Sequence, residues 1–453
     1  MAASRRQFLE VLVPLALLPG TKALGGPRMR SILELFRPME FKSRGSSIAD
    51  PQGWRSQFPA LYQNVNGFPL AYLDSAATAQ RPAIVTKTLI DFYDHDNANP
   101  GRGLHTLARR ADEDYENSRR TAAHFINAAD PLEIVFTRGT TEGINLVASA
   151  WGGANLRPGD EVLLTVSEHA SSMLPWQLAA RRAGASVRYV DIHEDGRLRL
   201  DQLDALLTPR TKVFSFMQVS NVLGLINPAK ELCARAREYG VLSVVDAAQS
   251  VPHFKVDVQE IGCDFLAFSG HKMMGPMGTG ILWGRRELLD AMPPYQAGSN
   301  MAHEVKLDSA EYSAGALKFG AGTPNVSGAV GLAAAMKFIS TIGYDALRHH
   351  EQVLTQHALS RIRELPRVRL LGLALPTERI GVFSFVVEGV AAKDVVTALD
   401  AKGIAIRGGD LASLPLLTRL GVTRAARASL YLYSTLEEID RLVDALENLR
   451  RNN

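Results

Sequence analysis

The chain has 453 residues, enough for two or three domains at about 100–200 residues each. Its composition, 46% hydrophobic and 21% charged, predicts a globular protein with a large core. The net charge of +3 is small and no long basic run occurs, so nothing indicates nucleic-acid binding. The two cysteines, Cys233 and Cys263, exclude a disulfide framework and a multi-cysteine metal site, and leave a single bridge open.

The first 26 residues differ from the rest of the chain. Arg5-Arg6 precedes Phe8-Leu9 and an apolar stretch from Val11 to Leu18, which is too short to span a bilayer. This pattern resembles a twin-arginine signal and predicts export of the folded protein by the twin-arginine translocase to the periplasm or beyond. The alternative is a basic N-terminus on an ordinary helix, and residues 21–26 match an A-x-A cleavage site poorly. No later segment is apolar enough to predict a stable membrane span.

Residues 27–69 are interrupted by proline and glycine, which predicts a linker followed by a packed N-terminal arm. Asn66-Gly67 predicts a tight hairpin turn before the short strand Leu70 to Leu73. That strand ends in the small residues of Asp74-Ser75-Ala76-Ala77, which would allow a ligand to approach closely.

The middle of the chain alternates short β-rich runs with helical segments such as 176–182 and 229–239. The β-rich runs are residues 134–136, 161–165, 187–190, 213–216, 242–245 and 265–268. This alternation predicts an α/β fold with a mostly parallel sheet covered by helices.

Polar residues follow the ends of these runs. They are Thr140 and Thr141, Glu168 and His169, Ser220 and Asn221, Asp246 and Gln249, and Ser269 with His271 and Lys272. Because ligands of open α/β sheets bind outside the carboxyl ends of the strands, we expect these side chains to converge. The Gly-Thr-Thr turn at a helix N-terminus suits a phosphate, although threonine is also an ordinary helix cap.

Lys272 stands in a confined turn between small residues, directly after the buried run 265–268. A lysine amine enclosed in this way can form a Schiff base with an aldehyde cofactor, because burial lowers its pKa. A purely structural Ser-Gly-His turn is the alternative for this stretch alone.

Taken together, the strand-end residues fit pyridoxal 5′-phosphate (PLP). Lys272 would hold the aldehyde, and Asp246 would keep the pyridine nitrogen protonated so that the ring withdraws electrons from Cα. Gln249 would bond the ring hydroxyl and His169 would lie on the ring face. The expected phosphate donors are Thr140, Thr141, Ser269 and His271. The expected catalytic residues are Lys272, His169 and Asp246.

From Tyr72 to Leu449 the sequence resembles the class V aminotransferase family, and within it the SufS-type cysteine desulfurases. The matching stretches are residues 72–77, 102–106, 138–145, 219–224, 264–275, 321–325 and 427–429. The resemblance implies PLP fold type I, with a seven-stranded-type sheet in a large domain, residues 70–335, and a smaller α+β domain, residues 336–453. It also implies a homodimer in which Thr323 reaches the neighbouring cofactor phosphate. The substrate-binding residues that it implies are Asn221, Arg407, Arg427 and His105.

The sequence departs from the desulfurase pattern on one loop. The segment 407–416 keeps the family's register, but Ala412 stands at the position of the sulfur-accepting cysteine and Asp410-Leu411 replace a His-His pair. Alanine has no nucleophile and cannot carry a persulfide. Two further departures, Ser171-Ser172 and Lys318-Phe319-Gly320, are expected to touch the pocket.

The family resemblance is therefore a stronger argument for the cofactor than for the reaction that the enzyme catalyses. We expect an exported PLP enzyme that acts on an amino acid or peptide-like substrate, siderophore precursors included, by transamination, β-lysis or epimerisation through a Cα carbanion. Cysteine desulfurase or selenocysteine lyase activity is the alternative. A non-catalytic PLP-binding partner is a third reading, and Asn221, Arg407 and Arg427 argue against it, since a scaffold needs no substrate ligands.

Overall fold

The computed structural model describes residues 53–101, 103–372 and 375–449. The predicted export signal, the first part of the predicted linker and Arg102 lie outside the described residues.

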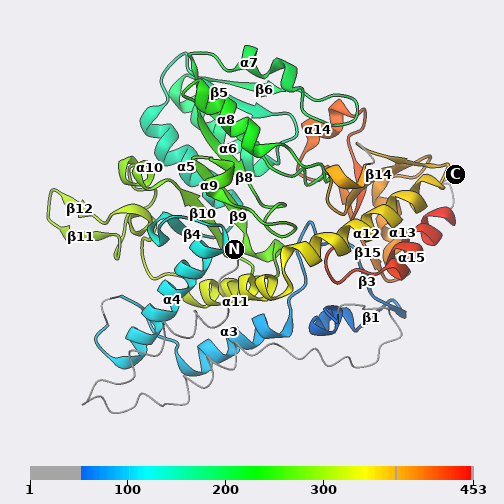
Figure 1. Ribbon diagram of the computed structural model, residues 1–453, viewed down its shortest axis with the longest axis horizontal. Helices are drawn as coiled ribbons and strands as arrows, with labels where there is room; N and C mark the ends of the chain where they lie inside the picture. Colours follow the sequence, from blue (N-terminus) through cyan, green and yellow to red (C-terminus); the bar gives the residue numbers. More distant parts are fainter. Residues whose placement is uncertain (1–52, 102, 373–374, 450–453) are drawn as a thin grey trace, which may run out of the picture. The chain divides into compact units, whose positions relative to one another are not determined.

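A seven-stranded sheet forms the centre of the larger part of the chain (Figure 1). Its strands, in the spatial order β4-β10-β9-β8-β7-β5-β6, are β4 (Ile134–Thr137), β10 (Gly280–Gly284), β9 (Phe265–Ser269), β8 (Leu242–Asp246), β7 (Thr211–Met217), β5 (Glu161–Thr165) and β6 (Ser186–Val190). Neighbouring strands from β9 to β6 are parallel, whereas β10 runs antiparallel to both β4 and β9. The predicted mostly parallel sheet is confirmed.

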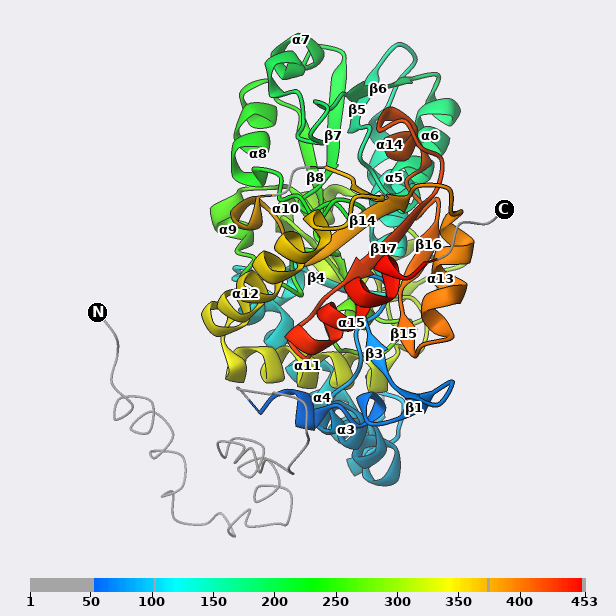
Figure 2. The ribbon, with the colours of Figure 1, turned by 90° about the vertical axis from the view of Figure 1, so that its right-hand side faces the viewer.

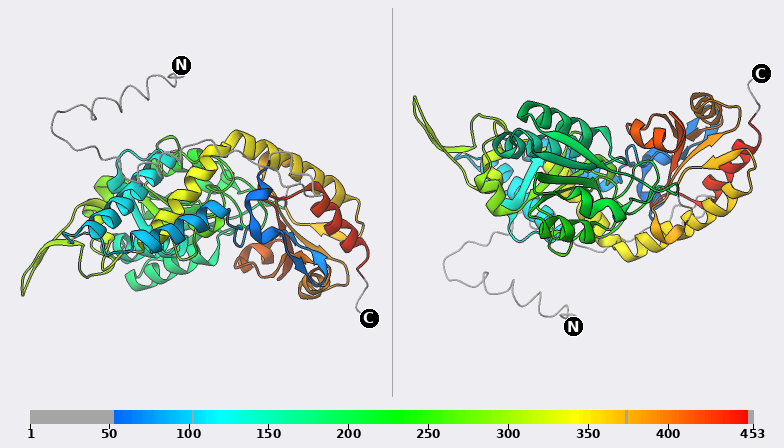
Figure 3. Two further views of the ribbon diagram at one scale, coloured as in Figure 1. Left: turned by 90° about the horizontal axis from the view of Figure 1, so that it is seen from below. Right: turned by 90° about the horizontal axis from the view of Figure 1, so that it is seen from above.

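Helices lie on both sides of this sheet when it is viewed along its edge (Figure 3). They are α3 (Ala83–His95), α4 (Thr106–Phe125), α5 (Thr140–Asn155), α6 (Ala170–Ala183), α7 (Leu203–Leu206), α8 (Ala229–Glu238), α9 (Val258–Ile261), α10 (Arg286–Ala291) and α11 (Val326–Ile342). Ile144 and Val147 of α5 and Trp176 of α6 pack with Leu164 and Phe265 of the sheet in one apolar core. Strands β5, β8, β9 and β10 are buried along their whole length, as expected for a sheet covered on both faces, whereas the edge strand β6 is only partly buried.

The C-terminal part contains a four-stranded antiparallel sheet with the order β13-β14-β17-β16 (Figure 2). Its strands are β13 (Val368–Leu370), β14 (Val382–Val387), β17 (Ala425–Ser429) and β16 (Arg407–Gly409). The helices are α12 (Tyr344–Arg363), α13 (Ala392–Asp400), α14 (Leu414–Arg419) and α15 (Leu436–Glu447). Leu354, Phe383, Leu399 and Leu442 are members of its separate apolar core.

The N-terminal segment crosses to the C-terminal part. Strand β3 (Ala71–Tyr72) pairs in parallel with β15 (Ile404–Ala405), and Ala71 and Leu73 pack in the core of the C-terminal part. Farther upstream, the buried Arg55 donates to Glu438 of α15 at 2.8 Å. This segment therefore fixes Asp74, the residue after Leu73, beside the C-terminal sheet.

Two hairpins and several single turns of 3-10 helix complete the description. Strands β1 (Asn64–Val65) and β2 (Phe68–Pro69) meet at Asn66 and Gly67, whose φ angles are 53° and 84°, as expected for a tight hairpin turn. The second hairpin is β11 (Ala302–Val305) with β12 (Ala310–Tyr312). The 3-10 turns are η2 (Arg55–Gln57), η3 (Pro59–Leu61), η4 (Pro131–Glu133), η5 (Leu200–Gln202), η6 (Gly270–Lys272), η7 (Gly315–Phe319) and η8 (Pro376–Glu378).

No single helix in the described ranges has the length and apolar composition needed to cross a membrane; α11 and α12, with a bend of 78° between them, meet that requirement only as a pair.

Candidate active site

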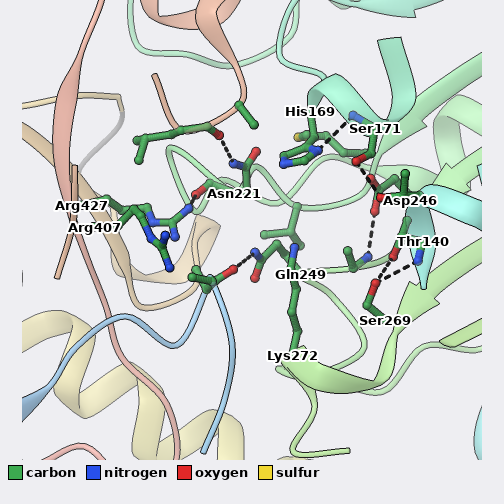
Figure 4. Close-up of a pocket in the computed structure, with 18 of the residues that line it drawn as sticks. Thr140, His169, Ser171, Asn221, Asp246, Gln249, Ser269, Lys272, Arg407 and Arg427 are labelled. Atoms are coloured by element: carbon green, nitrogen blue, oxygen red, sulfur yellow. Dashed lines mark hydrogen bonds between the residues drawn. The ribbon is translucent and has the colours of Figure 1, made fainter. Parts of the chain in front are cut away.

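A cavity of about 490 Å³ opens where the carboxyl ends of the parallel strands face the C-terminal part of the chain (Figure 4). Eleven predicted site residues line it: Thr140, Thr141, His169, Asn221, Asp246, Gln249, Ser269, His271, Lys272, Arg407 and Arg427. Nine of them end or follow strands of the central sheet, as the strand-end rule predicts, whereas Arg407 and Arg427, which the family resemblance implies, come from the C-terminal sheet.

Lys272 is held in η6, a tight turn that follows β9. The turn closes through backbone bonds from Met273 N and Gly275 N to Gly270 O, at 3.0 and 2.8 Å. A side chain at position 270 would come within 2.9 Å of Thr279 O, so this position requires glycine. Burial lowers the pKa of the Lys272 amine to about 8, with Arg427 adding to the decrease and Asp246 opposing it. A substantial neutral fraction near pH 7 to 8 lets this amine act as a nucleophile or base.

Asp246 is the last residue of β8 and is 6% exposed. Its Oδ1 accepts a hydrogen bond from Ala248 N at 2.9 Å. Burial raises the pKa of this carboxyl, while the nearby Lys272 lowers it. Among the described side chains it forms no ion pair, and it borders the cavity, so a cationic ring nitrogen would provide the partner that a buried carboxylate requires.

Gln249, which also lines the cavity, has a side-chain oxygen without a hydrogen-bond donor among the described residues. Its Nε2 donates to Ala76 O at 2.8 Å, whereas its buried Oε1 has no hydrogen-bond partner in the described part of the chain. Leaving a buried acceptor without a donor costs about 1–3 kcal/mol. A ligand hydroxyl would satisfy it, which fits a hydroxylated pyridine ring.

His169 caps the N-terminus of α6, where its Nδ1 accepts from Ser171 N at 3.1 Å. The ring proton therefore resides on Nε2. Burial lowers the pKa of His169 to about 4, and the charges of Lys272 and Arg427 act in the same direction. The imidazole is neutral at pH 7, a state suited to lying against an aromatic ring.

Hydroxyl and backbone donors gather at the N-terminus of α5. Ser269 Oγ accepts from Thr140 N at 2.9 Å and is hydrogen-bonded to Thr140 Oγ1 at 2.7 Å. Thr141 Oγ1 is hydrogen-bonded to Ser171 Oγ at 2.8 Å. Gly139 has a φ of 146°, and a side chain there would contact Ser269 Oγ at 3.0 Å. This end of the cavity suits a phosphate, because a helix N-terminus favours negative charge.

His271 also lines the cavity, as a neutral group. Burial lowers its pKa to about 4, with Lys272 and Arg81 adding to the effect. The expected role of His271 toward a phosphate is therefore that of a neutral donor without a positive charge.

The opposite end of the cavity carries two arginines and an amide. Arg427 Nη1 donates to Asn221 O at 3.0 Å, and its Nη2 lies 3.4 Å from Asp74 Oδ1. Arg407 Nη2 lies 2.8 Å from Asp74 Oδ2. Arg427 is 4% exposed, and its buried Nε has no hydrogen-bond partner among the described residues. A guanidinium with donors to spare in a cavity is suited to a carboxylate.

A loop of the C-terminal part closes this end. Leu411 and Ala412 have φ angles of 54° and 55°, a left-handed backbone that is unusual for residues other than glycine. Ala412 O accepts from Ala170 N at 2.8 Å, and Leu411 O accepts from Asn221 Nδ2 at 3.0 Å. The loop is therefore tied to both the start of α6 and the end of the β7 segment.

Two predicted site residues lie elsewhere in the single chain. His105 caps α4, where its Nδ1 accepts from Ala108 N at 3.3 Å, and it is exposed. Thr323 is also exposed, and neither residue lines the cavity. The substrate role of His105 and the role of Thr323 toward a second subunit stay predictions.

The expectation that Lys318 touches the pocket is wrong. Its Nζ donates to the carbonyl oxygens of Leu289, Asp290 and Met292 at 3.2, 2.6 and 3.0 Å. Three carbonyls satisfy all three of its donors, so Lys318 fixes the end of α10. Ser171, in contrast, lines the cavity as expected.

The sequence does not predict a site role for two aspartates. Asp74 stands at a strand end of small residues, and Asp410 at the position of a family histidine. Asp74 pairs with both arginines and Asp410 lines the cavity. A carboxylate directly after a short strand was the one available signal for Asp74.

Neither cysteine belongs to the site. Cys233 and Cys263 are free and buried, and neither lines the cavity. Burial raises the pKa of the Cys233 thiol to about 12 and that of Cys263 well above its usual range. Both are therefore poor nucleophiles.

Comparisons with known proteins agree with this geometry. The family model for aminotransferase class V matches residues 71–442. A probable cysteine desulfurase of Halalkalibacterium halodurans is 46% identical over 393 residues, which is 87% of this chain and 96% of the relative. A cysteine desulfurase of Salmonella typhimurium is 45% identical over 398 residues, covering 88% of this chain and 97% of the relative.

Solved structures give the same assignment. The cysteine desulfurase CsdA of Escherichia coli superposes with a TM-score of 0.81 at 37% identity, covering 88% of this chain and 98% of that one. The apo cysteine desulfurase of Thermococcus onnurineus NA1 gives 0.83 at 35% identity, with 89% and 98% covered. The chain therefore belongs to the aminotransferase class V family and is a PLP-dependent enzyme of fold type I.

Proposed function

We propose that the enzyme is a carbon–sulfur lyase that cleaves the Cβ–S bond of a cysteine-type α-amino acid and releases the sulfur as a small molecule. One observation carries this proposal: the cavity has groups for an amino acid on PLP, yet the loop residue that faces it is Ala412, and no cysteine is among the described residues that line it. Relatives named as cysteine desulfurases favour cysteine chemistry over siderophore tailoring, transamination or epimerisation.

The arrangement of the site indicates which residues would bind each part of PLP. Lys272 would bind the aldehyde carbon, Asp246 the ring nitrogen, Gln249 the ring hydroxyl and His169 the ring face. The phosphate would take donors from Thr140, Thr141, Ser269 and His271. When bound, PLP supplies an electron sink that makes the Cα proton of an amino acid acidic.

The remaining steps belong to the chain itself. Arg427 and Asn221 would hold the substrate carboxylate, which fixes the bond at Cα that is broken. Lys272, with a pKa lowered to about 8, would take the Cα proton and return a proton as the reaction proceeds. Arg407 would act on the carboxylate together with Arg427.

The residue at position 412 determines whether the substrate sulfur can be transferred to the protein. A desulfurase needs a thiolate that attacks the substrate sulfur, and an alanine side chain offers none. In the proposed reaction the Cβ–S bond breaks with its electron pair leaving on sulfur, which takes up a proton as a thiol or sulfide. The three-carbon fragment then takes up water and yields pyruvate and ammonia, so no oxidant or reductant is consumed. A Cβ selenium atom would leave in the same way.

The products test this proposal. We expect cysteine to give pyruvate, ammonia and sulfide from the purified holoenzyme, with no persulfide on the protein. Ala412→Cys is the matched variant and should gain at most partial persulfide, because Asp410 and Leu411 replace the family's histidine pair. Cys233→Ser/Cys263→Ser controls for the two buried thiols. Alanine as the main product, together with persulfide on the wild-type protein, would contradict the proposal.

We also propose that the enzyme is exported and acts as a homodimer. Export is supported by Arg5-Arg6 and the short apolar stretch after it, and the periplasm is the expected destination. The dimer is supported by Thr323, an exposed residue that by family resemblance would reach the cofactor phosphate of a second subunit.

A further inference from the structure

The charged groups around the cavity are almost all accounted for by the cofactor and the substrate carboxylate. The cations that line it are Lys272, Arg407 and Arg427, and the carboxylates that line it are Asp246 and Asp410. Asp246 lies close enough to Lys272 for each charge to shift the pKa of the other group. Asp410 forms no ion pair with any described residue and is exposed, so its charge is left uncompensated.

The two arginines cannot neutralise Asp410, because Asp74 already pairs with both. Its Oδ2 is 2.8 Å from Arg407 Nη2 and its Oδ1 is 3.4 Å from Arg427 Nη2. The arginines and Asp74 therefore form a group with a net charge of +1, which one substrate carboxylate balances. Asp410 remains as a separate negative charge on the cavity wall.

The Asp410 carboxylate is held in place by its own loop. Its Oδ1 accepts from Ala412 N at 3.0 Å, and its backbone oxygen accepts from Ser413 N at 3.0 Å. This turn stabilises the left-handed backbone of Leu411 and Ala412, a conformation that residues other than glycine, asparagine and aspartate seldom adopt. A carboxylate fixed in advance loses little freedom on binding a cation.

The loop that carries Asp410 borders the same cavity as the substrate-binding arginines, because Asp410, Leu411 and Ala412 all line it. Asn221 joins the two regions, because its backbone oxygen accepts from Arg427 and its side chain donates to Leu411 O. Ala412 lies next to Leu411 and also lines the cavity, and its methyl group takes less room than the cysteine of the family pattern would. The charge of Asp410 acts inside the cavity, since it opposes the decrease in the pKa of His169.

We propose that the cavity selects sulfur-bearing α-amino acids whose side chain ends in an ammonium group, and that Asp410 is the specificity-determining residue. This inference rests on the proposed carbon–sulfur lyase function and adds the class of substrate. The substrate ammonium would pair with the free oxygen of Asp410, while the α-carboxylate binds at Arg427.

Three S-substituted cysteines with the same Cβ–S bond test the proposal with the holoenzyme. S-(2-aminoethyl)cysteine ends in an ammonium, S-propylcysteine in a methyl group of similar size, and S-carboxymethylcysteine in a carboxylate. We expect kcat/KM to be about 1.5- to fivefold higher for the ammonium than for the methyl compound, the range of an exposed ion pair. The carboxylate compound should be the poorest of the three.

Asp410→Asn removes the negative charge and keeps the loop conformation, because asparagine retains the oxygen that accepts a hydrogen bond from Ala412 N. We expect this variant to lose the preference for the ammonium compound over S-propylcysteine, so that the ratio of the two kcat/KM values falls to about one. Asp410→Ser keeps a similar cap and should behave in the same way if the Asn variant does not fold. Asp410→Lys should favour the carboxylate compound. An unchanged preference in a folded Asn or Ser variant would overturn the proposal.

A binding measurement keeps the two proposals apart. Lysine and 2-aminoheptanoate have the same chain lengths as the first two compounds and contain no sulfur, so their affinities can be measured by calorimetry without turnover. We expect lysine to bind more tightly to the wild type and equally to Asp410→Asn. If no S-substituted cysteine is cleaved but this difference is found, the lyase function fails and the role of Asp410 stands. If lysine has no advantage in the wild type, the role of Asp410 fails.

Discussion

Arg407 and Arg427 stand directly opposite each other in the register of β16 and β17. Like charges at facing positions of a sheet repel each other. Asp74 lies between the two guanidinium groups and accepts from both. The pairing of β3 with β15 brings Asp74 to this place. The N-terminal segment therefore supplies the negative charge that reduces the repulsion between the two arginines at the substrate-carboxylate end of the cavity.

The first prediction concerns the difference between these two arginines. Arg427→Lys should raise KM for the amino acid about 10- to 100-fold and change kcat less, because lysine cannot form two parallel bonds to a carboxylate. Arg407→Lys is the matched control; its side chain is half exposed and should tolerate the change better. Steady-state kinetics with cysteine measures both variants. A larger increase in KM for Arg407→Lys would reverse the assignment.

The second prediction concerns Lys272. The purified wild type should be yellow, and borohydride reduction should fix PLP to Lys272, as peptide mass spectrometry would show. Lys272→Ala should lose this covalent attachment and reduce kcat by about 10³-fold or more, since it removes both the nucleophile and the base. Lys272→Arg keeps the charge and should be equally inactive. Covalent attachment at another lysine would refute the assignment.

The third prediction concerns export. Replacement of Arg5-Arg6 by Lys-Lys should retain the precursor in the cytoplasm, folded and with its cofactor bound, because the twin-arginine route reads this pair. Fractionation of the cells that produce the protein, followed by immunoblotting, measures where it is located. A wild-type protein found wholly in the cytoplasm with an intact N-terminus would exclude export.

The sequence was sufficient to predict most of the site because the evidence for it is local. Apolar runs mark the buried strands, and the residues after them, such as His169, Asp246 and Lys272, fall at one edge of a parallel sheet. The family resemblance added Asn221, Arg407 and Arg427, which lie in the C-terminal part or face it. These residues line one cavity in the structure.

The features that sequence could not predict depend on contacts between distant segments. Asp74 meets Arg427 only because β3 crosses to the C-terminal part. The left-handed backbone of Leu411 and Ala412 has no glycine to signal it. Lys318 looked like a pocket residue, and only the fold shows that three carbonyl oxygens surround it.

The last prediction concerns a buried acid behind the cavity wall. Glu168 is fully buried, and its Oε1 accepts from Thr165 Oγ1 at 2.7 Å and from Met217 N at 3.0 Å. Its other oxygen, Oε2, has no hydrogen-bond partner in the described part of the chain. Burial raises the pKa of Glu168 from 4.5 to about 8, with the nearby Asp246 adding to the increase and the hydrogen bonds opposing it.

A carboxyl with a raised pKa makes stability depend on pH in a defined direction. Between pH 4.5 and about 8, the folded protein holds a proton on Glu168 that the unfolded chain has released. The free energy of unfolding therefore loses a contribution as the pH rises through this range. The histidines act in the opposite direction over an overlapping range: the pKa values of His169 and His271 fall to about 4, so their contribution increases with pH between 4 and the ordinary histidine pKa of about 6.5.

Glu168→Gln isolates the contribution of the acid, because glutamine has a similar shape and cannot ionise. The histidine contributions cancel when the variant and the wild type are compared at each pH. We expect the melting temperature of the variant, relative to that of the wild type, to increase from pH 5 to about 8 and then to level off, measured by calorimetry on the PLP-free protein. Glu168→Asp keeps an ionisable group and should retain the wild-type trend. A difference between Glu168→Gln and wild type that stays constant over this range would show that Glu168 is ionised in the folded protein, and would require a cationic partner for it.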